Sequence, residues 1–229
     1  MLVYKAWRET RSRFLLSAAA LTWFCGAFVV LRPAIQYAAH RPFEAFVIDA
    51  IYAGSVRNIF VLFVIALGLG GLAEEFARGS AAFTLALPAT RTRLVASRAT
   101  VGVLEVVGVA LIPTITVLGL SPLVGETFNV TEAVLYSIQW AATGAVLFAM
   151  AFLLSIWLTG AYAALTASIL VLAVYASILN VPTIRAVPAL NVFALMDRTH
   201  PSAMRLAWAF VAAVVLIAAA AWSTERQDF

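Results

Sequence analysis

Long apolar stretches alternate with short charged segments along this chain. Four of the stretches are about as long as one helical crossing of a bilayer: residues 14–31, and approximately residues 58–73, 100–120 and 206–222. A hydrocarbon core of about 30 Å takes roughly 20 apolar residues in a helix, fewer or more with thinning or tilt. The pattern therefore predicts four transmembrane helices from these stretches.

A fifth stretch is much longer, because no charged residue occurs between Glu132 and Arg185. It is too long for one crossing and suits two. We expect the hairpin between them at Thr159-Gly160, since glycine is common at helix ends. The sequence thus predicts an all-α membrane protein with six transmembrane helices, in which residues 1–229 form one transmembrane domain.

Composition supports a lipid environment. Hydrophobic residues make up 64% of the 229 residues and charged residues only 11%, against about 25% charged in ordinary soluble domains. A chain of this size cannot bury so much apolar surface internally. Much of that surface must face lipid.

The N-terminal segment, residues 1–13, mixes Leu2 and Trp7 with four basic residues. Such a mixture predicts an amphipathic helix in the membrane interface, in contact with anionic lipid. A simple topology signal is the alternative. The apolar run that follows exceeds the h-region of about 7–15 residues in a signal peptide, so we expect it to be retained as a helix.

Basic residues favour cytoplasmic termini. Nine lie on the side of the two termini: Lys5, Arg8, Arg11, Arg13, Arg78, Arg91, Arg93, Arg98 and Arg226. Six lie on the other side: Arg32, Arg41, Arg57, Arg185, Arg198 and Arg205. The positive-inside rule then predicts a multi-pass protein of the bacterial cytoplasmic (inner) membrane with both termini inside.

The chain lacks the residues that several kinds of activity require. Lys5 is the single lysine and stands outside any glycine-rich loop, so there is no Walker A motif and we expect no ATP hydrolysis by this chain. Cys25 is the single cysteine, and His40 and His200 lack metal-ligand spacing. We expect no enzymatic activity, no metal or cofactor on this chain, and no nucleic-acid partner.

The predicted cytoplasmic segment 74–98 is the most informative part of the sequence. Its pattern predicts a short helix that ends at Pro88, followed by basic residues at the start of the next span. Phe83, Leu85 and Leu87 place apolar side chains beside charged ones at an aqueous face, which usually marks a contact surface.

This segment resembles the permease subunits of type 2 ABC exporters. Seven residues follow the family pattern in order: Glu74, Glu75, Gly79, Leu87, Pro88, Thr90 and Arg91. Ser80 stands where threonine is commoner and keeps a hydroxyl. The chain length and the layout of spans are also similar to that family.

The resemblance implies a coupling helix that docks into a groove of a separate cytoplasmic ABC ATPase, which would carry ATP and Mg²⁺. The expected docking residues are Glu74, Glu75, Arg78, Gly79, Ser80, Phe83, Leu87, Pro88 and Arg91. It also implies a second permease chain, identical or related, and outward transport of a hydrophobic or amphipathic substrate by alternating access. Residues 180–205, with three prolines, are expected to form an external loop with short re-entrant helices.

Glu105 is the single predicted intramembrane acid. Ionisable groups within spans are usually functional, but near a helix end Glu105 can also snorkel or pair with Arg98. Gly68, Gly70 and Gly71 predict close helix packing. The alternatives to an ATP-driven permease are an ion-gradient-driven secondary transporter, which usually shows inverted repeats and buried charges, and a polytopic enzyme or assembly factor, whose side-chain constellation is not visible.

Overall fold

The computed structural model describes most of the chain as helix. The described residues are 2–34, 40–69, 91–158, 163–181, 183, 195–196 and 202–226, without the side chains of residues 91, 178 and 179. Six longer helices run through them: α1 (Leu2–Leu31), α4 (Ser55–Gly68), α7 (Arg91–Leu120), α8 (Val130–Trp157), α9 (Ala163–Asn180) and α11 (Ala203–Arg226). The shorter elements are η1 (Arg32–Ala34), α3 (Phe43–Val47), a π-helical turn η2 (Ile48–Tyr52) and η3 (Ser121–Val124).

Five segments are long and apolar enough to cross a membrane: Leu2–Ala34, Phe43–Gly68, Thr92–Val124, Val130–Trp157 and Ala203–Arg226. Within the described ranges no strand occurs. The coarse prediction of an all-helical chain with several potential membrane spans is confirmed. The apolar part of α9, Ala163–Ser177, is shorter than these five, so a sixth crossing stays a prediction.

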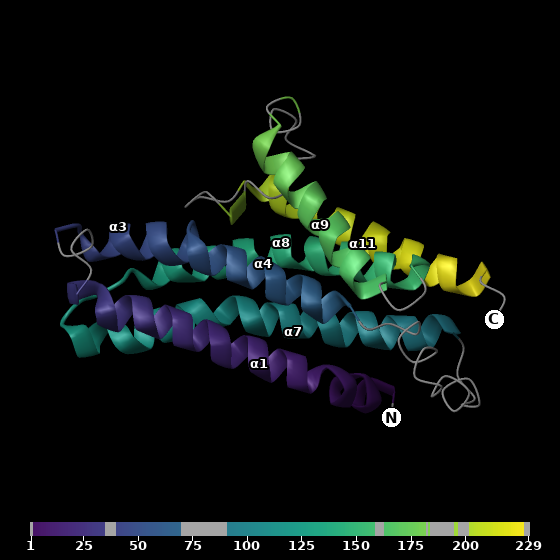
Figure 1. Ribbon diagram of the computed structural model, residues 1–229, viewed down its shortest axis with the longest axis horizontal. Coiled ribbons are helices and arrows are strands. Elements are labelled where there is room, and N and C mark those ends of the chain that lie inside the picture. The colour runs from purple at the N-terminus through teal and green to yellow at the C-terminus, as the bar shows by residue number, and fades with distance from the viewer. Residues whose placement is uncertain are drawn as a thin grey trace.

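The helices form an elongated bundle in which α1, α4, α7 and α8 follow the long axis (Figure 1). The first turn of α1 and the last turn of α11 lie toward the same end, where α7 begins and α8 ends. In contrast, α9 rises at an angle from the bundle. It packs mainly on α8 and less on α4, and it buries Ala167 and Val171.

The N-terminal segment differs from the prediction. A separate helix over residues 1–13 is not present among the described residues, because α1 runs without interruption from Leu2 to Leu31. No proline or glycine occurs near Arg13 to end a helix there, and backbone hydrogen bonding continues through it. Contact of these first turns with a lipid interface remains a prediction.

The second apolar segment also starts earlier than predicted, at Phe43 rather than Asn58. Glu44 and Asp49 interrupt the apolar run in the sequence, but both are accommodated on a helix whose other face buries Phe46 and Ile51. Asp49 forms an ion pair with Arg41. The residues preceding α4 are therefore a packed helical extension of the second apolar segment.

The turn between α7 and α8 follows from local chemistry. Gly125 takes a left-handed conformation with φ of 73° and closes η3 by donating its N–H to Pro122 O at 3.2 Å. Asn129 then caps α8, with its side-chain oxygen accepting from Thr131 N at 2.9 Å. Glu132 in the first turn complements the helix dipole.

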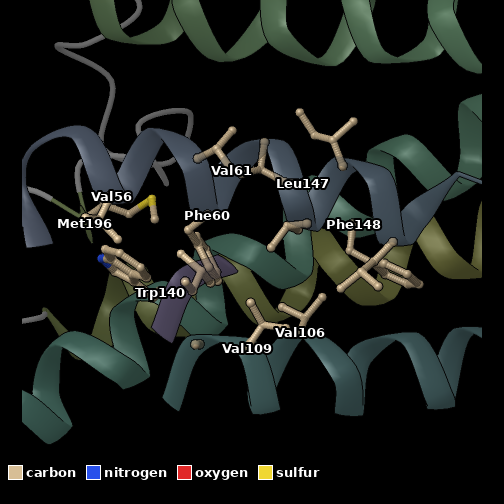
Figure 2. Close-up of a cluster of buried hydrophobic side chains, with 14 of the residues drawn as sticks. Val56, Phe60, Val61, Val106, Val109, Trp140, Leu147, Phe148 and Met196 are labelled. Atoms are coloured by element: carbon tan, nitrogen blue, oxygen red, sulfur yellow. The ribbon is translucent and has the colours of Figure 1, made fainter. Parts of the chain in front are cut away.

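The core lies where α4, α7 and α8 meet (Figure 2). Trp140 and Phe60 are fully buried, with ring centroids 4.6 Å apart, and Tyr52 stacks on Tyr136 at 4.3 Å. In a bilayer such packing, rather than exclusion of water, is the main attraction between helices. The centre of the described bundle is thus filled by side chains.

Candidate functional site

Most of the predicted docking residues lie outside the described residues, namely Glu74, Glu75, Arg78, Gly79, Ser80, Phe83, Leu87 and Pro88. Arg91 begins α7, but its side chain is not described. The described chain ends before this segment at Leu69 and resumes after it at Arg91. The ATPase-docking surface therefore stays a prediction, while the helices that flank it are described.

The end of α4 is held by α1. Arg13 donates through Nη1 to the carbonyl oxygen of Leu69, the C-cap of α4, and lies 3.5 Å from that of Ala66. The last carbonyls of a helix lack partners within it, and a cation there also complements the helix dipole. Arg13 thus connects α1 to the residue that leads into the predicted coupling loop.

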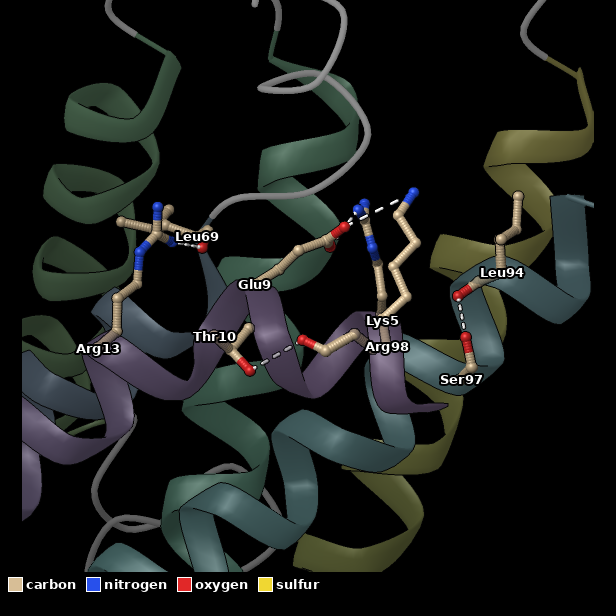
Figure 3. A network of polar contacts seen from close by, with 9 residues as sticks. Lys5, Glu9, Thr10, Arg13, Leu69, Leu94, Ser97 and Arg98 are labelled. Carbon is tan, nitrogen blue, oxygen red and sulfur yellow. Dashed lines mark hydrogen bonds and ion pairs between the residues drawn. The ribbon is translucent and has the colours of Figure 1, made fainter. Parts of the chain in front are cut away.

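A cluster of polar side chains joins α1 to α7 near the same level (Figure 3). We call it the α1–α7 polar cluster; its members are Lys5, Glu9, Thr10, Arg13, Arg98 and Glu105. Glu9 accepts from Arg98 Nη2 at 2.7 Å and lies 3.6 Å from Lys5 Nζ, one helical turn away. Thr10 donates its hydroxyl to Glu105.

The partners of Glu105 differ from those considered in the sequence. Its hydrogen-bond donor is Thr10, whereas Arg98 binds Glu9. Arg13 attracts it electrostatically. Glu105 is 3% exposed, and among the described residues its Oε2 atom has no hydrogen-bond partner.

At the opposite end of the same two helices a second polar junction forms. Arg32 Nη1 lies 2.5 Å from Glu126 Oε1, and its Nη2 donates to Arg41 O at 2.6 Å. The guanidinium also lies 5.2 Å from the ring centroid of Phe43, which adds a cation–π contact. Sequence reasoning missed this junction, because each of these residues reads as an isolated loop residue.

The two junctions bracket the uncharged parts of α1 and α7. The uncharged run of α1 lies between Arg13 and Arg32, and that of α7 and η3 lies between Glu105 and Glu126. A rise of 1.5 Å per residue gives these runs lengths of about 27 Å and 30 Å, close to the thickness of a hydrocarbon core. The pairing of α1 with α7 therefore matches the limits of two potential membrane spans.

A third set of contacts ties the end of α11 to its neighbours. Thr92 donates to Glu225 at 2.5 Å, and Trp157 Nε1 donates to Ser223 Oγ at 2.7 Å. These contacts link the start of α7 and the end of α8 to one helix. Their partners are far apart in sequence, so no local pattern could have indicated them.

Metal chemistry has no support in the described part of the chain, where no group of three His, Cys, Asp or Glu side chains is placed to hold an ion. No protein-family model and no curated protein matches this chain.

Proposed function

We propose that this chain is the membrane-spanning permease subunit of an ATP-driven ABC exporter in the bacterial inner membrane, with both termini in the cytoplasm. The observation that carries the proposal is the ordered set in residues 74–91, an acidic pair followed by Gly79, Leu87-Pro88 and Arg91, between two potential membrane spans. The ATPase, with its ATP and Mg²⁺, would be a separate chain.

The attachment of α4 to α1 supports a mechanical role for this segment. A force on the predicted coupling loop reaches α4 at Leu69 and α7 at Arg91. Because Arg13 binds Leu69 and the polar cluster joins α1 to α7, the three helices would move as one body. Rigid-body motion of this kind is a common form of alternating access.

The filled core supports a second permease chain, identical or related. With Trp140, Phe60 and Leu147 fully buried at the centre, a substrate path is more easily formed between two chains than through one. The outer face of α9 is apolar, with Leu165 and Ile169 more than half exposed, and offers a surface for such pairing. A hydrophobic or amphipathic substrate fits apolar walls of this kind.

Copurification with an ABC ATPase tests the docking claim. The tagged chain is coexpressed with a candidate ATPase, and the complex is isolated and quantified. Phe83→Asp with Leu87→Asp should abolish recovery of the ATPase, because it places two charges in the predicted apolar contact. Leu123→Asp is the control: it adds the same kind of charge at a 79% exposed residue after the opposite end of α7. Full recovery with the double variant would overturn the docking claim.

A separate experiment tests on which side of the membrane the predicted coupling loop lies. In a Cys25→Ser background, Ser80→Cys provides a single thiol in the predicted coupling loop. We expect a membrane-impermeant maleimide to label this thiol only after the cells are opened. Labelling in intact cells would contradict the proposed orientation and, with it, the docking of a cytoplasmic ATPase.

The ion-gradient-driven alternative rests on buried Glu105. It predicts transport into vesicles without ATP that is abolished by a proton uncoupler and by Glu105→Gln. The ABC proposal instead predicts transport that needs ATP and survives the uncoupler.

A further inference from the structure

A cavity of about 260 Å³ lies between α1 and α7, beside the α1–α7 polar cluster. It is lined by Val3, Trp7, Phe14, Val101, Leu104 and Glu105. Val3 is 56% exposed and Leu104 is 64% exposed, so the cavity opens on the outer surface of the bundle. None of these residues belongs to the predicted docking segment.

The residues that line the cavity carry two polar side-chain groups, the Glu105 carboxyl and the indole N–H of Trp7. Thr10 donates to Oε1 of Glu105, while Oε2 has no hydrogen-bond partner among the described residues. Buried polar atoms in folded proteins nearly always have partners, so an exception asks for an explanation. An ionised carboxyl accepts several hydrogen bonds. The carboxyl of Glu105, a residue that lines the cavity, can therefore accept at least one more.

The cationic side chains near Glu105 do not donate a hydrogen bond to its Oε2 atom. Arg13 is the nearby guanidinium that attracts Glu105, and it donates hydrogen bonds to the carbonyl oxygens of Leu69 and Ala66 at the end of α4. Arg98 and Lys5 are engaged with Glu9. None of these three cations donates a hydrogen bond to Oε2.

The other walls favour a cation with an apolar tail. Trp7 and Phe14 pack with ring centroids 5.5 Å apart and form an aromatic wall, and aromatic faces attract organic cations. The volume lies just below the range of about 300–1,000 Å³ that holds whole drug-sized ligands. It suits a headgroup, whose alkyl chain can extend over the exposed apolar surface at Leu104.

We propose that this cavity binds the protonated amine headgroup of a cationic amphiphile, with the carboxylate of Glu105 turning from its buried position to accept from an ammonium N–H and with Trp7 beside the charge. The need for a donor makes the site selective: a primary alkylammonium binds, whereas a quaternary ammonium of equal charge and chain length lacks the N–H. Binding requires neither the ATPase nor transport.

Equilibrium binding of radiolabelled dodecylamine to the full chain in nanodiscs of zwitterionic lipid tests the site, with empty nanodiscs as the blank. We expect saturable binding that is competed by unlabelled dodecylamine about tenfold or more better than by dodecyltrimethylammonium, and not by dodecanol. Glu105→Gln should weaken binding about tenfold or more, and Trp7→Leu about two- to fivefold.

Glu132→Gln is the matched control, because it removes one carboxylate in the first turn of α8, away from the cavity, and should bind normally. Retention of the fold in each variant is checked by the slow reaction of the buried thiol of Cys25. If Glu105→Gln is misfolded, Val101→Phe supplies a second test, because it fills the cavity without changing charge and should also weaken binding. Wild-type affinity in folded Glu105→Gln, equal competition by the quaternary amine, or no saturable binding would overturn the site. None of these outcomes bears on ATPase docking.

Discussion

Arg13 on α1 donates a hydrogen bond to the carbonyl oxygen of Leu69, the residue at which α4 ends. The two residues are far apart in sequence: Arg13 lies in one potential membrane span, and Leu69 directly follows another. Their contact holds the C-terminal end of α4 against α1. We therefore expect a movement of the segment after Leu69 to be transmitted to α1.

Loss of this contact should destabilise the protein. Arg13→Met leaves the terminal carbonyls of α4 without their charged donor, at a cost of about 1–3 kcal/mol. The measurement is thermal unfolding in detergent, followed by a dye that fluoresces on reaction with Cys25, the single and fully buried thiol. Arg11→Met, at an exposed residue of the same helix, is the control and should unfold at the wild-type temperature. Equal unfolding temperatures for the two variants would show that the hydrogen bond from Arg13 to Leu69 does not contribute to stability.

A double-mutant cycle should detect coupling across the junction of Arg32 and Glu126. The side chain of Arg32 is 13% exposed and that of Glu126 is 39% exposed, so partial screening limits their coupling energy to about 1 kcal/mol. Stability is compared for Arg32→Met, Glu126→Gln and the double variant. Additive losses would mean that this ion pair is energetically neutral. Arg32→Met alone should cost more than Glu126→Gln, because it also removes the bond to Arg41 O.

Two glycine-to-alanine changes should have opposite effects. A Cβ at Gly68 would lie 2.7 Å from both Ala151 Cβ and Phe148 O on α8, so Gly68→Ala forces the helices apart and should cost about 1–3 kcal/mol. A Cβ at Gly119 would have no atom within 4 Å, so Gly119→Ala should be neutral or stabilise α7 by up to about 1 kcal/mol. The unfolding temperatures of the two variants give the comparison, and a stable Gly68→Ala would contradict the close packing of α4 on α8.

The register of α1 on α7 can be checked by cross-linking. In a Cys25→Ser background with a protease site inserted into residues 70–90, Thr10→Cys with Glu105→Cys should form an oxidative cross-link that keeps the two fragments together on a non-reducing gel. Arg11→Cys with Glu105→Cys is the control, because residue 11 points about 100° away around the helix. Equal yields from both pairs would place α1 in a different register.

The sequence determined the parts of this protein that depend on local composition. Apolar runs of bilayer length predicted the long helices, because a backbone in lipid must satisfy its own hydrogen bonds. Glu105 stood out because an acid within such a run is rare, and Gly68 indicated the close packing that the structure contains. The motif in residues 74–91 can be recognised only from the sequence, since it lies largely outside the described residues.

The tertiary structure decided which charged residues meet. Nothing in the local pattern indicated that Arg13 binds the end of α4, that Arg32 binds Glu126, or that Thr10 contacts Glu105, since each contact depends on how two helices pack. The same holds for the extension before α4, where Glu44 and Asp49 look like loop residues until their helix buries its other face. Helix formation is a local property of the chain, whereas the partners of a side chain depend on the three-dimensional packing.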